Sequence, residues 1–190
     1  MKTDSLLATM LAAHITPLLR RAGFLHNGTT YLRTFPGGSQ RINFSTIETE
    51  PDQLAVWVLL GVNTHGYDTV RGRAHGMLDH SPLLWNDPLG RDDTTGHWTL
   101  DPTEAVGPLL ASMLRRQWLP ELALLADLPW VETQARAGRP FNNWTGFAAQ
   151  DQARTLLFVI AAQRDDPDID HYARHIPDAD LWLPHLPRGW

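Results

Sequence analysis

A nearly unbroken apolar run from Leu54 to Val62 constrains the fold more than any other stretch of the sequence. It follows the turn-forming triplet Glu50-Pro51-Asp52. A strand that is apolar on both faces is normally central in its sheet and covered on both sides. The run therefore predicts a covered strand in the middle of a sheet.

Three further strands are expected around it. Thr30 to Phe35 is rich in residues that favour strands, and Arg41 to Ile47 alternates apolar with polar residues. The turn residues Pro36 to Ser39 separate these two stretches, which predicts an antiparallel hairpin. His97 to Leu100 is expected to supply a fourth strand.

Apolar residues at three-and-four spacing predict one helix near the N-terminus and a long one that starts at Asp101-Pro102. Pro17 and Pro120 lie inside these two patterns. A proline removes one backbone hydrogen bond, so each helix is expected to kink or divide there. No internal repeat is expected anywhere in the chain.

Shorter helices are expected over Leu128 to Gly138, Ala148 to Arg164 and Asp168 to His175, and the proline-containing tail to Trp190 is expected to be extended. The pattern predicts an α+β fold, with an antiparallel β-meander of about four strands packed with N-terminal and C-terminal helices. At 190 residues the chain is expected to form a single domain over residues 1–190.

Charge and composition argue against several classes of protein. The chain has 16 basic and 21 acidic residues, a net charge of −5, and its basic residues are scattered. A nucleic-acid surface needs clustered positive charge, so DNA and RNA are not expected partners. The absence of cysteine excludes disulfides and thiolate chemistry. With neither a membrane-length apolar run nor a signal-peptide pattern, the chain is expected to be cytoplasmic.

The segment from His65 to His97 is rich in Gly, Pro, Asp and His. Structureless stretches of this length are uncommon, so a short strand or helix is expected within it. His75, His80 and His97 are candidate ligands for a divalent metal, because neutral imidazole binds such ions. Their spacing matches no known motif, so a solvated, hydrogen-bonded loop is the alternative, and no cofactor is expected.

Four polar residues are candidates for contacting a partner. Arg33 lies on a strand whose hairpin neighbour presents Asn43, and Arg71 and Arg73 follow the central strand. Arginine pairs bidentately with carboxylates, so these residues could form a face that binds an anion or a protein. A solvated sheet face with a cross-strand pair is the alternative.

Turn glycines and short apolar motifs follow one another in a definite order over roughly residues 5 to 135. They are Gly23-Phe24, Gly28, Tyr31, Arg33, Ile42-Asn43-Phe44, Leu60-Gly61-Val62 and Trp118-Leu119-Pro120. This order resembles a bacterial family catalogued only as a domain of unknown function. The resemblance implies the fold and implies no activity.

Two functions of different classes remain open. The chain has no nucleophile elbow, phosphate loop or dinucleotide fingerprint, which favours a non-catalytic protein. The first hypothesis is a cytoplasmic protein-binding domain, such as an immunity-type protein that neutralises a toxin through charge complementarity. The second is an enzyme or ligand-binding domain that uses residues 65–97, with or without a metal. Convergence of His75, His80 and His97 would favour the second.

Overall fold

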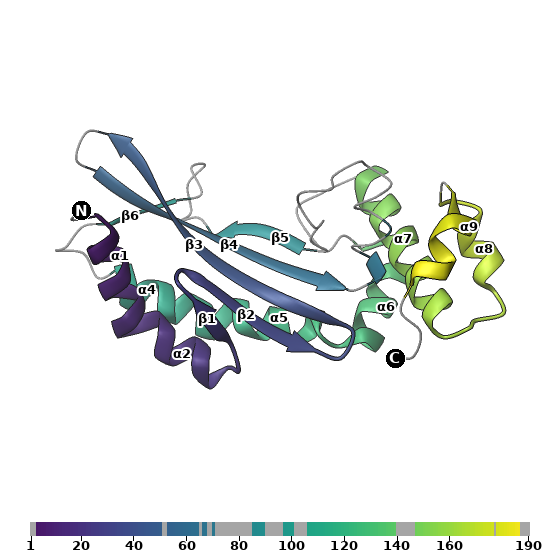
Figure 1. Ribbon diagram of the computed structural model, residues 1–190, viewed down its shortest axis with the longest axis horizontal. Helices are drawn as coiled ribbons and strands as arrows, with labels where there is room; N and C mark the ends of the chain where they lie inside the picture. The colour runs from purple at the N-terminus through teal and green to yellow at the C-terminus, as the bar shows by residue number, and fades with distance from the viewer. Residues whose placement is uncertain are drawn as a thin grey trace. The chain divides into compact units, whose positions relative to one another are not determined.

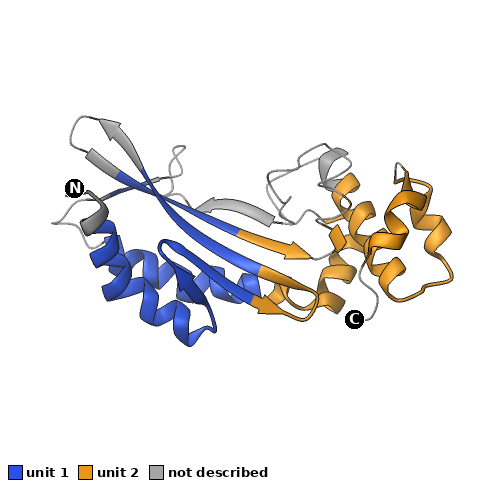
Figure 2. Ribbon diagram, in the orientation of Figure 1, with its two compact units in different colours: residues 1–33, 40–60, 87–123 blue, residues 34–39, 61–86, 124–190 orange. Residues whose placement is uncertain are grey.

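The structure is a computed structural model, and it describes residues 3–50, 53–64, 66–67, 70, 85–89, 97–100, 106–139, 147–176 and 178–186. Contacts within the chain group into two compact units, shown in Figure 2. Unit 1 comprises residues 1–33, 40–60 and 87–123, and unit 2 comprises residues 34–39, 61–86 and 124–190. The expectation of a single domain stays a prediction.

One antiparallel sheet contains all the strands that the described residues form. Five strands follow one another across it in chain order, and the sixth, β6, pairs with β4 (Figure 1). The strands are β1 (Leu25–Asn27), β2 (Thr30–Phe35), β3 (Gly38–Glu50), β4 (Gln53–Thr64), β5 (Trp85–Leu89) and β6 (His97–Leu100). The α+β prediction is confirmed, and β5 is the short element expected between His65 and His97.

Strand β4 is the central strand that the apolar run predicts, with β3 on one side and both β5 and β6 on the other. Val56, Val58, Leu60 and Val62 have no exposed surface. Trp57 points to the other face and is 37% exposed. The expectation that both faces are covered is therefore wrong at this tryptophan.

Tight turns connect the first three strands. Gly28 (φ +60°) lies in the turn between β1 and β2, and Gly37 (φ +87°) in the turn between β2 and β3. Glycine adopts such left-handed conformations without a steric penalty. The Asn27-Gly28 turn also pairs Leu25 with Leu32 across the strands. Because β1 has only three residues, its sequence does not reveal it as a strand.

Two long helical segments with the same order of helix types lie on one side of the sheet (Figure 1). The first comprises α1 (Thr3–Met10), a π-helical segment (Leu11–Ile15) and α2 (Thr16–Arg21). The second comprises α4 (Val106–Met113), a π-helical segment (Leu114–Trp118) and α5 (Leu119–Leu125). The predicted start of the second helix at Asp101-Pro102 lies outside the described residues.

Both helical segments continue through their prolines without a break, so division at the proline is wrong, and a kink there stays a prediction. A proline ring clashes with the carbonyl four residues earlier in an α-helix. Here a π turn precedes Pro17 and Pro120, so that the Thr16 N–H bonds to the Leu11 oxygen and the Leu119 N–H to the Leu114 oxygen. Such a widened turn changes the hydrogen-bond spacing beside each proline and lets the helix continue.

The two helices also share a short sequence repeat, which corrects the expectation that the chain has none. Residues 6–11 read LLATML and residues 109–114 read LLASML, with a proline six residues after each. The two π-helical segments begin at equivalent positions, Leu11 and Leu114. Apolar residues at matching positions are buried in both helices: Leu7, Leu11, Ile15 and Leu19 in the first, and Leu110, Leu114, Trp118 and Leu122 in the second.

Unit 2 is mainly helical in its described part. Its helices are α6 (Leu128–Arg136), α7 (Phe147–Gln163), α8 (Ile169–Ala173) and α9 (Ala179–Trp182), followed by a 3₁₀ turn (Leu183–His185). The Asp127 side chain caps α6 by accepting a hydrogen bond from the Trp130 N–H, and α6 and α7 closely follow the predicted ranges. The extended tail is a wrong prediction, because residues 179–185 are helical. Ala179 and Leu186 belong to one buried cluster with Phe158 and Val159 of α7.

A small ion network joins three helices of unit 2. Glu132 on α6 accepts hydrogen bonds from Arg136 at 2.7 Å and from Arg164, just after α7, at 2.6 Å. Arg136 also donates to the Tyr172 hydroxyl on α8. Burial alone would raise the pKa of Glu132, but the hydrogen bonds from the two arginines outweigh burial and lower it. The network therefore favours an ionised Glu132.

Candidate functional site

Arg33 faces the helices and is committed to contacts inside unit 1. Its Nε and Nη2 donate to the Gln40 Oε1 at 2.9 Å and 2.5 Å, and its Nη1 donates to the Ala22 carbonyl at 2.8 Å. The guanidinium also lies over the Phe24 ring, 4.6 Å from the ring centroid. Arg33 thus ties β2 to β3 and to the end of α2.

The partners of Arg33 that the structure describes are all uncharged. Burial lowers the pKa of Arg33. Gln40 is fully buried, and its Nε2 donates in turn to the Leu122 carbonyl on α5. A chain of hydrogen bonds therefore runs from the end of α2 through Arg33 and Gln40 to α5. This arrangement cross-links the sheet and both helical segments of unit 1.

Asn43 lies on the opposite face of the sheet. It accepts a hydrogen bond from the Thr30 hydroxyl at 2.8 Å and donates one to the Ser45 Oγ at 2.8 Å. Side chains alternate between the two faces of a strand, which separates Asn43 from Gln40 on β3 and Thr30 from Arg33 on β2. The structure therefore does not bring Arg33 and Asn43 onto one face.

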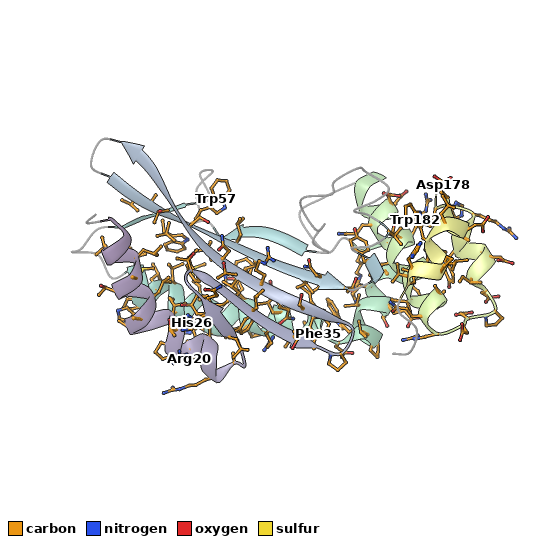
Figure 3. The ribbon with its side chains drawn as sticks, viewed as in Figure 1. Arg20, His26, Phe35, Trp57, Asp178 and Trp182 are labelled. Carbon is orange, nitrogen blue, oxygen red and sulfur yellow. The ribbon has the colours of Figure 1, made fainter. Side chains whose placement is uncertain are left out.

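The face that carries Asn43 also carries large apolar side chains. Leu25 and Leu32, paired across β1 and β2, are 80% and 41% exposed. Trp57 on β4 points away from the helices (Figure 3). We call Leu25, Leu32, Asn43, Ser45 and Trp57 the open face of unit 1. Contiguous exposed apolar patches mark interaction sites, whereas singly exposed apolar residues are common on any protein surface.

Sequence reasoning did not select the apolar members of the open face. Trp57 belongs to a nearly continuous apolar run, so the pattern alone suggests packing. The alternation of side chains along a strand does, however, offer a usable signal for which residues share a face. Arg33 stands two residues from both Tyr31 and Phe35, so alternation assigns all three to one face and Leu32 to the other. Tyr31 is buried against the helices, where it hydrogen-bonds Thr16 at 2.7 Å.

The other predicted site residues cannot be compared with this geometry. Arg71, Arg73, His75 and His80 lie outside the described residues, and His97 is described only as backbone of β6, paired with Trp57. Within the described part of the chain, no group of three or more His, Asp or Glu side chains could hold a metal ion. The metal site at residues 65–97 therefore stays a prediction.

Among the helices that the structure describes, none combines the length and the apolar character needed to cross a membrane. Comparisons with protein-family models, with curated proteins and with solved structures find no match to this chain. The resemblance to a bacterial domain family of unknown function therefore stays a prediction.

Proposed function

We propose that this chain is a cytoplasmic, non-catalytic protein-binding domain that uses the open face of unit 1, and that it neutralises another bacterial protein in the manner of an immunity protein. The observation that carries the proposal is the exposure of Leu25, Leu32 and Trp57 on one sheet face. Aromatic side chains are enriched in protein interfaces, and tryptophan often dominates their binding energy.

The polar members of the open face fit the same function. Asn43 and Ser45 form a hydrogen-bonded row on β3, and Asn43 also accepts a hydrogen bond from the neighbouring Thr30 on β2. A typical interface surrounds an apolar centre with polar groups that can hydrogen-bond to the partner or to water. The net charge of −5 favours a basic partner, because opposite charge accelerates association.

The proposal is tested by affinity capture from the source cells with the wild-type chain and two variants. We expect the wild type to retain a stoichiometric partner and the double variant Leu25→Ser/Leu32→Ser to lose it. Leu109→Ser is the matched control, because Leu109 is 44% exposed but lies on helix α4. Circular dichroism checks that each variant is folded.

The identity of the captured protein decides the second half of the proposal. An immunity function requires that the partner be toxic when expressed alone and harmless when expressed with this chain. Recovery of no stoichiometric partner, or equal capture by the wild type and the open-face variant, would contradict protein binding through this face. Capture of a non-toxic partner would retain protein binding and exclude neutralisation.

A further inference from the structure

A groove of about 360 Å³ lies between the two helical segments of unit 1. Its polar side chains are His14, Arg21, Ser112 and Arg115. Pro17 and Pro108 contribute apolar wall. The groove belongs to the helices and not to the sheet face on which the proposed function rests.

The helices approach closely at one end of this groove. A Cβ atom on Gly107 would lie 2.5 Å from the His14 Cδ2 and 2.9 Å from the Met10 Cγ. Glycine at this position therefore allows the His14 ring to pack directly against α4. This contact places one end of the groove at the start of the second helical segment, beside Pro108.

Both π-helical segments contribute to the lining. His14 belongs to the first (Leu11–Ile15) and Arg115 to the second (Leu114–Trp118). Single π turns inside α-helices occur frequently at functional sites, because the wider turn changes the direction of its side chains. Two such turns from separate parts of the sequence meet at one groove here.

The charge of the groove contrasts with that of the protein. The two helical segments carry four arginines, Arg20, Arg21, Arg115 and Arg116, against two acids, Asp4 and Glu121, whereas the whole chain has a net charge of −5. None of the described residues that line the groove is acidic. Among the described residues, neither Arg21 nor Arg115 has a hydrogen-bond or ion-pair partner. Two positive charges that face the same groove without a neighbouring acidic side chain favour the binding of an anion between them.

We propose that this groove binds a small organic phosphate. Arg21 and Arg115 contact the phosphate, because the guanidinium fork matches phosphate oxygens bidentately. The Ser112 hydroxyl supplies a further donor, and Pro17 and Pro108 contact the carbon skeleton of the ligand. The volume falls within the range of about 300–1,000 Å³ that is usual for small-molecule sites.

The test is isothermal titration of the full chain with glycerol 3-phosphate at constant ionic strength. We expect saturable binding with one ligand per chain. Arg21→Gln and Arg115→Gln should each weaken the affinity about tenfold or more, the usual size for loss of a charge-assisted hydrogen bond. Arg116→Gln is the matched control and should change affinity less than about twofold, because Arg116 is also exposed on the same helix but does not line the groove.

Two further ligands separate phosphate recognition from other binding. Glycerol should not bind, and citrate should bind at least about tenfold more weakly than glycerol 3-phosphate if the site selects phosphate. Absence of saturable binding, an equal loss of affinity in Arg116→Gln, or equal affinity for citrate would overturn the proposal. All three arginines are exposed, so these variants are expected to fold, and an unchanged thermal midpoint checks this. Because Leu25 and Leu32 lie outside the groove, phosphate binding should persist in the open-face variant even if the proposed function fails.

Discussion

Two arginine centres show how differently the two units use the same side chain. In unit 1, Arg33 bonds to the side chain of Gln40 and to the Ala22 carbonyl, none of which carries a charge. In unit 2, Arg136 and Arg164 bond to the carboxylate of Glu132. Burial lowers the pKa of Arg33, whereas the hydrogen bond to Glu132 raises that of Arg136.

Solvent exposure distinguishes the contributions that the two arginine centres make to stability. Arg136 and Arg164 retain 51% and 43% of their side-chain exposure, so water and salt weaken their attraction to Glu132. Arg33 instead satisfies a buried acceptor that water cannot reach. Removing the partner of a buried polar group costs the full desolvation of that group. The Arg33 centre, which has no ion pair, is therefore expected to contribute more to the free energy of unfolding than the Glu132 centre.

The largest effect is expected for Arg33→Met. This change removes three hydrogen bonds and leaves the Gln40 Oε1 buried without these donors, so the free energy of unfolding should fall by about 3 kcal/mol. Urea unfolding measures the change. Arg41→Met is the control, because Arg41 is exposed on the neighbouring strand. A loss below about 1 kcal/mol would mean that Arg33 does not hold unit 1 together.

Gln40→Leu should lower the free energy of unfolding by a smaller amount, about 2 kcal/mol, measured again by urea unfolding. Leucine fills similar space but cannot accept from Arg33 or donate to the Leu122 carbonyl. Arg33 is only partly buried, so its guanidinium can recover hydrogen bonds to water. If Gln40→Leu is neutral, the connection from β3 to α5 depends on apolar packing and not on this amide.

In unit 2, Glu132→Gln should lower the free energy of unfolding by about 1 kcal/mol at pH 7. The folded pKa of Glu132 is lowered, so its contribution is complete above the pKa of an unfolded glutamate, about 4.3, and is lost as the pH falls through the folded value. The difference between wild type and variant should therefore shrink below about pH 4. The Arg33→Met difference should stay constant over the same range, because neither Gln40 nor the Ala22 carbonyl titrates. Equal pH dependence in both variants would contradict the assignment of a titrating partner to unit 2 alone.

The smallest effect is the response to salt. A double-mutant cycle between Glu132 and Arg164 should give a coupling energy of about 0.5 kcal/mol at low ionic strength, and most of it should disappear in about 1 M NaCl. The corresponding cycle between Arg33 and Gln40 should be nearly independent of salt. If the coupling between Arg33 and Gln40 falls with salt as steeply as that between Glu132 and Arg164, the two centres do not differ in the way that their charges imply.

Much of the fold was accessible from the sequence because it depends on neighbours along the chain. The hairpin of β2 and β3 and the apolar run of β4 are both local patterns. Helices α6 and α7 follow from apolar spacing for the same reason. The C-terminal tail was mispredicted because its prolines argue against a helix locally, whereas packing of Ala179 and Leu186 on α7 stabilises one.

The candidate sites were harder to predict because they depend on contacts between distant segments. Arg33 suggested a binding face, and only the packing of α2 and Gln40 against it shows that its donors are used within unit 1. The apolar run around Trp57 suggested that its side chain is packed in the core. Only the position of the helices on the other face of the sheet leaves it exposed. The repeated LLATML and LLASML motifs were visible in the sequence, but nothing in them says that the two helices lie together.

The central strand, the hairpin before it and the α+β class follow from local sequence patterns, because apolar periodicity and turn residues act over a few positions. Packing between distant segments settles whether the helices continue past Pro17 and Pro120, through π turns in helices packed against one another and the sheet. It also decided which arginines are used in the fold and which line a groove. Arg33 and Arg115 are the same residue type, and only the segments that fold against each of them separate a structural cross-link from a candidate binding residue.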